Sequence, residues 1–311
     1  MQQIFNDNLR ILVTGAGGFV GKNLTEFLSS KYFVIGAGHN DLELTDENAV
    51  KDFIKRNKIN FIIHCANIGG SRKTVYDQGS VDVVSKNLRM FFNLARCLTS
   101  DMRMIHFGSG AEYDRRNYQP KMSEDFFDTY VPEDDYGYSK YIMSKYIRGS
   151  ENIVGLRIFG LYGKYEDYKF KFISNAIVKN LIKLPILINQ NVMFDYLYIN
   201  DFLNIVEKFI NIKPKRKIYN ITPEKSIDIV SAANIINEIS NFKSEIIIVN
   251  DSMNRAYSGN NSLIMDEISP FKFTSYEDGI QNLYNYYKTI IQTIDFEAIK
   301  EDPFLKFCKS S

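Results

Sequence analysis

Apolar residues in the first half of the chain fall into short continuous runs, separated by longer stretches with helical spacing. Short runs bounded by turn residues are typical of strands buried on both faces, whereas a helical apolar period indicates an amphipathic helix. The pattern predicts strands at residues 9–15, 32–36, 60–66, 102–107 and 153–158, and helices at 23–30, 46–57, 81–99 and 138–147. This alternation predicts a parallel sheet covered by helices on both faces.

The second half of the chain is less regular, although no linker or internal repeat separates it from the first. Helices are expected at residues 172–183, 201–212, 227–240 and 276–294, and strand-like segments at 186–188, 194–199, 218–221 and 245–249. We therefore predict an α/β protein whose doubly wound parallel sheet carries a smaller, mixed α/β C-terminal region.

A glycine-rich segment, Gly-Ala-Gly-Gly-Phe-Val-Gly at residues 15–21, lies directly between the first strand and the first helix. Such glycines permit a tight turn and a close approach of the backbone to a pyrophosphate, which the helix N-terminus then binds. The segment predicts a dinucleotide-binding Rossmann domain of residues 1–160, with returning segments at about 194–221. Residues 161–193 and 222–311 would then form a substrate-binding region.

The end of the second strand bears on which dinucleotide is bound. Enzymes that use NAD usually carry an acidic residue there, which hydrogen-bonds the ribose hydroxyls. Residues 34–40, Val-Ile-Gly-Ala-Gly-His-Asn, hold neither a carboxylate nor an arginine. NADP(H) is therefore favoured, with His39 as the group that could contact its additional phosphate, and NAD(H) remains possible.

Composition narrows the classes of partner. The chain has 311 residues and a net charge of +1, so its charge does not indicate binding to nucleic acid or to an anionic membrane. No apolar run approaches the ~18 residues of a membrane span. The three histidines and three cysteines show neither a CxxC pair nor metal-ligand spacing. We expect a cytoplasmic protein with no metal site.

A tyrosine precedes a lysine by four residues at Tyr136/Lys140, Tyr141/Lys145, Tyr165/Lys169 and Tyr284/Lys288. Context selects the first pair, which begins a helix at the carboxyl edge of the predicted sheet, where such sheets bind ligands. Ser109 lies at the same edge, in the Gly-Ser-Gly-Ala-Glu-Tyr segment at residues 108–113. Lys140 would lower the pKa of Tyr136 and reach a ribose hydroxyl, Tyr136 would transfer a proton, and Ser109 would hydrogen-bond the same substrate oxygen.

Together these residues resemble the extended short-chain dehydrogenase/reductase family, the NAD-dependent epimerase/dehydratase group that acts on nucleotide sugars. The likeness covers nearly the whole chain through residues 62–66, Asn87, 156–163 and 195–201. The resemblance is greatest to the branches of GDP-L-fucose synthase and dTDP-4-dehydrorhamnose reductase. Residues 42–46, and a loop that contains residues 68–70 and Tyr76, are similar to segments of these branches. Gly110-Ala111 also sets the chain apart from the 4,6-dehydratases, which carry an acidic pair there.

The resemblance implies a role for individual residues. Catalysis would depend on Ser109, Tyr136 and Lys140. The dinucleotide would contact Gly15, Gly17, Gly18, Phe19, Val20, Gly21, His39, Leu44, Cys65, Ala66, Asn87, Tyr136 and Lys140. The nucleotide-sugar substrate would contact Ser109, Gly110, Asn175 and Arg255.

Three departures from the resemblance limit the chemistry that it implies. Fucose synthases epimerise their substrate with a cysteine and a histidine, but here Ala111 takes the cysteine position and no histidine follows His106. Their pyrophosphate arginine is replaced by Phe194, so Arg255 is expected to carry more of that contact. Should an acid/base pair exist nonetheless, Glu112, Tyr162 and Lys164 are the first candidates.

The favoured function is the NAD(P)H-dependent reduction of a 4-keto nucleotide-activated sugar, in the biosynthesis of surface-glycan sugars. A nucleotide-sugar 4-epimerase with tightly bound NAD is the alternative. A non-catalytic dinucleotide sensor is a third possibility, but a sensor has no use for a proton-transfer set. The expected partner is a nucleotide-diphosphate sugar, and the chain is expected to form a homodimer.

Overall fold

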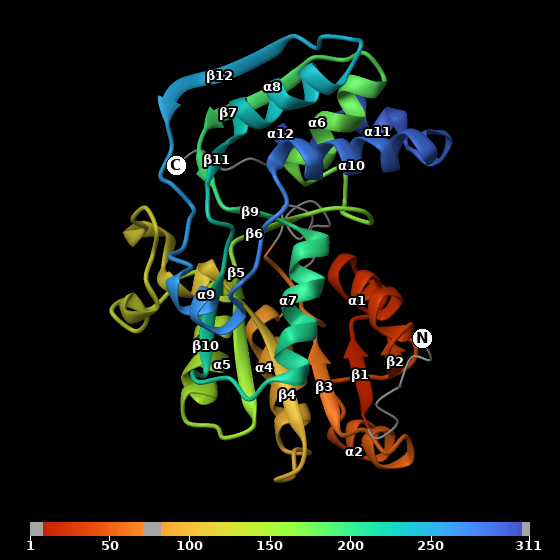
Figure 1. Cartoon of the computed structure of the whole chain (residues 1–311), viewed down its shortest axis with the longest axis vertical. Helices are drawn as coiled ribbons and strands as arrows, with labels where there is room; N and C mark the ends of the chain where they lie inside the picture. Colours follow the sequence, from red (N-terminus) through yellow and green to blue (C-terminus); the bar gives the residue numbers. More distant parts are fainter. Residues whose placement is uncertain (1–8, 71–81, 307–311) are drawn as a thin grey trace.

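A computed structural model describes residues 9–70 and 82–306 of the chain (Figure 1). Its central sheet contains β1 (Arg10–Thr14), β2 (Phe33–Ala37), β3 (Phe61–His64), β4 (Arg103–Ser109), β5 (Ile153–Ile158) and β10 (Ile218–Ile221). These six strands lie in the order β10-β5-β4-β3-β1-β2, and every neighbouring pair is parallel. The predicted α/β class with a parallel sheet is confirmed.

Helices cover both faces of this sheet (Figure 1). One face packs against α1 (Phe19–Ser29), α7 (Ile199–Asn211) and α9 (Ser262–Ile268), and the other against α2 (Glu47–Arg56), α4 (Val83–Ala95) and α5 (Asp135–Arg148). Because successive strand residues point to opposite faces, Ile11 and Val13 enter the first core and Leu12 the second. The sheet is therefore doubly wound, as predicted.

Three helices begin earlier than the apolar pattern predicts. One is α7, which begins at Ile199 rather than at residue 201, and the other two carry residues of the candidate site. The helix α1 begins at Phe19 rather than at residue 23, directly after Gly18, whose backbone is extended. The helix α5 begins at Asp135 rather than at residue 138, because the Asp134 carboxylate caps it by accepting the Gly137 N–H at 2.9 Å. Tyr136 therefore lies in the first turn of α5.

The remaining elements form a second, mixed layer at the upper end of the molecule in Figure 1. There α6 (Phe172–Leu181), α8 (Ile229–Ile239) and α10 (Tyr276–Thr289) share a core with β7 (Ile186–Asn191), which pairs with β12 (Ile246–Met253). Two short strand pairs complete it, β6 (Gly160–Tyr162) with β9 (Tyr196–Tyr198) and β8 (Met193–Phe194) with β11 (Ile227–Asp228). The C-terminal helices α11 (Phe296–Lys300) and α12 (Pro303–Lys306) follow.

Part of the second half returns to the central sheet. The strand β10 forms the sheet edge beside β5, and α7 packs in the same core as α1. The helix α9 also joins this core through Ile264 and Ile268, although its residues fall within the segment 222–311 that we assigned to the substrate-binding region. The division of the chain into two functional regions stays a prediction.

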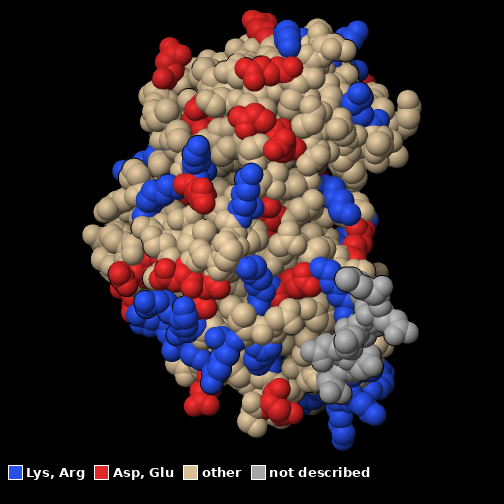
Figure 2. All heavy atoms as spheres, viewed as in Figure 1, with Lys and Arg blue, Asp and Glu red and all other residues tan. Residues whose placement is uncertain are grey.

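Figure 2 shows acidic and basic side chains interspersed over one face of the molecule. Within residues 9–70 and 82–306, no helix has both the length and the hydropathy that crossing a membrane requires.

Candidate active site

The sheet order reverses between β1 and β3, because β2 lies on one side of β1 and β3 on the other. Doubly wound sheets bind ligands beyond the carboxyl ends of their strands at such a point. Here the Thr14 hydroxyl joins the two strand ends, since it accepts the N–H groups of Cys65 and Ala66 at 3.2 Å each. Gly15, with φ of +65°, packs so closely on Ala66 that a Cβ would lie 2.8 Å from its nitrogen.

The start of α1 has the properties of a pyrophosphate site. Its N-cap, Gly18, has no side chain to occupy the free N–H groups of the first turn, which Phe19 and Val20 begin. A Cβ at Gly17 would meet nothing within 4 Å, so open space lies beside the loop, whereas a Cβ at Gly21 would lie 2.2 Å from the Gly15 carbonyl oxygen. Helix N-termini of this kind bind phosphate, and the predicted loop therefore fits a dinucleotide.

A carboxylate from beyond residues 34–40 lies next to the end of β2, and the preference for NADP(H) drawn from that segment stays a prediction. Asp41 turns back and its Oδ2 accepts the Gly38 N–H at 2.8 Å. His39 is exposed, with its Nδ1 3.8 Å from Glu43 Oε2. The Leu44 side chain is buried in the core beneath this turn. Sequence inspection missed Asp41 because it lies beyond the strand, and only the turn brings it back.

Ser109, Tyr136 and Lys140 come together at the carboxyl end of β4. Ser109 is the last residue of that strand, and its hydroxyl lies near enough to the Tyr136 phenol to act on the pKa of that phenol. The Lys140 ammonium lies 5.9 Å from the centroid of the Tyr136 ring and donates to the Phe107 carbonyl at 2.7 Å. Gly137 permits this arrangement, because a Cβ there would lie 2.7 Å from the Ala111 carbonyl oxygen.

Burial dominates the electrostatics of the pair. It raises the pKa of the Tyr136 phenol above its usual value, in the direction opposite to the one expected from its lysine neighbour. It also lowers the pKa of Lys140 to about 8, against the attraction of the Glu112 carboxylate. In the protein alone, Tyr136 is therefore protonated at neutral pH and available as a proton donor.

Two buried histidines lie behind Lys140 on neighbouring strands, with ring centroids 5.4 Å apart. Burial, and secondarily the Lys140 charge, lowers the pKa of His64 to about 3 and that of His106 well below its usual value, so both are neutral. In the part of the chain that the structure describes, His, Cys, Asp and Glu side chains form no group of three or more that could hold a metal ion.

The loop after β3 covers the Tyr136 ring. Gly70 has φ of +78°, and a Cβ there would lie 2.6 Å from Tyr136 Cζ. Asn87 fixes this loop, since it accepts the Ile68 N–H at 2.9 Å, donates to the Ile68 carbonyl at 2.8 Å and reaches the Ser139 hydroxyl at 3.3 Å. Tyr76, in the same predicted loop, lies outside the described residues.

Tyr257 is a site residue that sequence analysis missed. It follows β12, and its phenol lies 3.4 Å from Ser109 Oγ. Its backbone binds the segment at β8, with its N–H 2.8 Å from the Met193 carbonyl oxygen. Gly110 makes room for it, because a Cβ there would lie 2.7 Å from the Tyr257 hydroxyl. No sequence motif predicts this contact. The only signal for Tyr257 is that it lies two residues after Arg255, a predicted substrate residue.

The other predicted substrate residues have different surroundings. Asn175 is buried in α6 and donates to the Tyr168 carbonyl at 3.0 Å. Arg255 is exposed, and its guanidinium donates to the Arg116 carbonyl. Phe194 stacks on Tyr196 with ring centroids 4.9 Å apart. Substrate contact by Asn175 and Arg255 remains a prediction.

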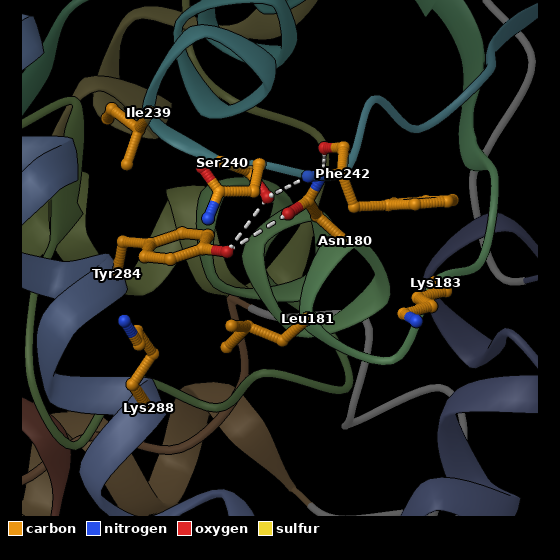
Figure 3. Close-up of a pocket in the computed structure, with 9 residues that line it drawn as sticks. Asn180, Leu181, Lys183, Ile239, Ser240, Phe242, Tyr284 and Lys288 are labelled. Atoms are coloured by element: carbon orange, nitrogen blue, oxygen red, sulfur yellow. Dashed lines mark hydrogen bonds between the residues drawn. The ribbon is translucent and has the colours of Figure 1, made fainter.

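The remaining Tyr/Lys pairs have other partners. Lys145 and the Tyr141 hydroxyl both bind Asp128, and the Tyr165 hydroxyl binds Glu26. Tyr284 and Lys288 line a surface hollow of about 230 Å³ between α6, α8 and α10, where the Tyr284 hydroxyl hydrogen-bonds Asn180 and Ser240 (Figure 3).

The three alternative acid/base candidates are also engaged elsewhere. Glu112 is fully buried in an ion pair with Arg157. The Tyr162 ring is buried in the core of the second layer. Lys164 pairs with Glu26 at 2.7 Å.

A model of the NAD dependent epimerase/dehydratase family matches residues 11–222. Among characterised relatives, GDP-L-colitose synthase of Yersinia pseudotuberculosis is 27% identical over 190 residues, which are 56% of this chain and 60% of that protein. The chain thus aligns with less than two thirds of that relative's length.

Solved structures show the same fold. A GDP-L-fucose synthetase from Naegleria fowleri superposes with a TM-score of 0.80 at 16% identity, over 94% of this chain and 98% of that one. A UDP-glucose 4-epimerase from Thermotoga maritima, solved with UDP-glucose, superposes with a TM-score of 0.79 at 17% identity, over 91% and 100% of the two chains.

Proposed function

Because the chain belongs to the NAD dependent epimerase/dehydratase family, we propose that it reduces a 4-keto nucleotide-activated sugar with NAD(P)H, in the supply of sugars for surface glycans. One observation carries the proposal. A protonated Tyr136 phenol, near the Ser109 hydroxyl and with Lys140 one helical turn away, forms a proton donor at the ligand-binding edge of the sheet.

The cofactor that we propose is a nicotinamide dinucleotide. The uncapped start of α1 and the open space beside Gly17 support its pyrophosphate there. When bound, its nicotinamide would supply the hydride that reaches C4. The preference for NADPH rested on the absence of a carboxylate at the end of β2, and Asp41 weakens that argument, so the proposal covers NADH and NADPH alike.

The protein's own residues would handle the proton. Ser109 would orient the C4 carbonyl oxygen, and Tyr136 would donate its proton to that oxygen as the alkoxide develops. Lys140 would stabilise the resulting phenolate and, with donors to spare beyond its bond to Phe107, hold a ribose hydroxyl. Since burial holds the pKa of Lys140 at about 8, activity should fall as pH rises through that value.

A nucleotide-sugar 4-epimerase is the second candidate, because the same serine, tyrosine and lysine can move a proton to and from a C4 oxygen in both directions. The raised pKa of Tyr136 favours the reductase, since a protonated phenol must donate before it can accept. The engagement of Glu112 and Lys164 by Arg157 and Glu26 supports chemistry at C4 alone, which both candidates share.

The test is steady-state kinetics of Tyr136→Phe with a 4-keto sugar nucleotide and NAD(P)H. Removing the phenol hydroxyl should lower kcat at least about 100-fold and change dinucleotide affinity little. Tyr141→Phe is the matched control on the same helix, since its hydroxyl binds Asp128, and it should retain wild-type kcat. A larger loss in the control than in Tyr136→Phe would refute the assignment.

A further inference from the structure

Glu112 lies beneath the candidate site, in the turn η1 (Gly110–Tyr113) that follows β4. Its side chain is fully buried, and both carboxylate oxygens accept hydrogen bonds. Oε1 accepts the Ser109 N–H at 2.8 Å, and Oε2 accepts the Ser144 hydroxyl at 2.7 Å and Arg157 Nε at 2.8 Å. A single carboxylate therefore joins the end of β4 to α5 and β5.

Ser109 is held from two sides by this turn. Its Oγ accepts the Ala111 N–H at 3.2 Å, while its own N–H donates to Glu112. Gly108 provides the space for the carboxylate, because a Cβ there would lie 2.4 Å from Glu112 Oε1. The Glu112 carboxylate is therefore part of the turn that holds Ser109 in place.

The second partner, Ser144, lies one helical turn after Lys140 on the same face of α5. The carboxylate that holds the Ser109 backbone therefore also holds the helix that carries Tyr136 and Lys140. Any shift of Glu112 would change the position of the serine relative to the other two residues.

The third partner, Arg157, is almost completely buried in β5. Its Nη1 donates to Asn220 Oδ1 at 3.1 Å and to the Tyr113 hydroxyl, and its guanidinium lies 4.4 Å from the centroid of the Tyr113 ring. Burying two charges carries a large desolvation cost, and an apolar pair of similar volume is often as stable. Stability alone is therefore a weak reason for the pair.

We propose that Glu112 and Arg157 form a positioning unit, which fixes Ser109 against the helix that carries Tyr136 and Lys140 and thereby sets the rate of proton transfer. This rests on the proposed function, because it assigns the three residues to one reaction. Neither member of the unit touches the substrate; both act through Ser109 and α5.

The unit also has an electrostatic effect on Lys140. The titratable groups that face this lysine, beside Tyr136 on its own helix, are Glu112, Cys65, His64 and His106. The two histidines are neutral, and burial raises the pKa of the Cys65 thiol, so Glu112 supplies the negative charge. Without it, burial would lower the pKa of Lys140 below about 8.

The test compares two double variants that each remove a buried ion pair without leaving one charge unpaired. Glu112→Gln/Arg157→Met keeps an acceptor for the Ser109 N–H but removes both charges. Lys179→Met/Asp302→Asn is the matched control, because that pair, 2.6 Å apart, is also buried but ties α6 to the start of α12. Dinucleotide affinity and thermal unfolding establish that each variant is folded.

We expect Glu112→Gln/Arg157→Met to lower kcat about 10- to 100-fold with little change in KM, as misplacement of reacting groups does. The alkaline limb of its pH–rate profile should move to lower pH, while the control keeps the wild-type kcat and profile. A kcat within about twofold of wild type, alongside a loss of stability equal to that of the control, would overturn the proposal.

A second measurement needs no turnover and separates this proposal from the proposed function. NMR of protein with ¹³Cε-labelled lysine, with Lys140 assigned by its loss in Lys140→Met, should give a lower titration midpoint in Glu112→Gln/Arg157→Met than in wild type. An unchanged midpoint overturns the electrostatic effect. If the variant shows this lower midpoint but the wild-type protein reduces no 4-keto sugar nucleotide, the proposed function is refuted and the electrostatic effect of Glu112 stands.

Discussion

Tyr136 and Lys140 illustrate at the residue scale what spacing can and cannot establish. All four pairs share the separation by one helical turn and follow Ser109, so only the predicted place of Tyr136 at the start of a helix at the carboxyl edge of the sheet favoured this pair. The direction of the Tyr136 pKa was wrong, because the sequence records the neighbouring cation but not the depth of burial, which has the larger effect. Tyr257 was missed for a related reason, since only tertiary structure brings it to Ser109.

Asp41 gives a prediction at the same scale. Its carboxylate lies at the strand end where a ribose hydroxyl would bind, and there it would attract NADH and repel the additional phosphate of NADPH. Asp41→Ala should therefore raise the ratio of the NADH to the NADPH dissociation constant, by about tenfold for the loss of one charge-assisted contact.

Fluorescence titration with both dinucleotides measures this ratio. Glu47→Ala, in which an exposed carboxylate of α2 is removed from its pair with Lys51, is the control and should leave the ratio unchanged. If Asp41→Ala leaves the ratio of the two dissociation constants unchanged, Asp41 only stabilises its own turn and does not select the dinucleotide.

At the scale of elements, the sequence predicted every strand of the central sheet, because buried parallel strands are continuous apolar runs between turn residues. Helix starts were less accurate. The apolar period does not identify Gly18 or Asp134 as helix caps, so the predicted helices began after the first turns of α1 and α5. These turns matter for function, since they carry the phosphate-binding N–H groups and Tyr136.

The strand expected at residues 194–199 shows where tertiary structure overrides pattern. It is divided into β8 and β9 at Asp195, whose buried carboxylate accepts the Gly259 N–H at 2.9 Å and binds Lys121 at 3.1 Å. An apolar pattern cannot anticipate such a bend, because the partners that fix it come from distant segments. The short helices α9, α11 and α12 were missed for lack of a sustained period.

For the whole molecule, the homodimer stays a prediction, and the exposed aromatic side chains of α5 offer a surface on which to test it. On α5, Tyr146 is 46% exposed and Tyr138 is 38% exposed, and the Phe92 ring of α4 lies 5.1 Å from that of Tyr146. Exposed aromatic residues are enriched at protein–protein interfaces. Tyr146→Asp should therefore convert a dimer into a monomer.

Size-exclusion chromatography with light scattering at one fixed protein concentration measures this mass. Phe296→Asp places the same charge at a comparably exposed aromatic residue of α11 and should remain dimeric. If wild type is monomeric, or if both variants stay dimeric, the α4–α5 surface is not the interface.

The central claim, reduction at C4 without chemistry at the neighbouring ring carbons, is tested most directly in deuterated water. A 4-keto sugar nucleotide and unlabelled NAD(P)H are incubated with the protein, and the product is examined by NMR and mass spectrometry. We predict oxidation of one equivalent of NAD(P)H per product and no deuterium at C3 or C5. With the corresponding 4-hydroxy sugar nucleotide as substrate, inversion at C4 without net oxidation of NAD(P)H would identify a 4-epimerase. With the 4-keto substrate, deuterium at C3 or C5 would contradict the account and make Tyr257 the first residue to examine.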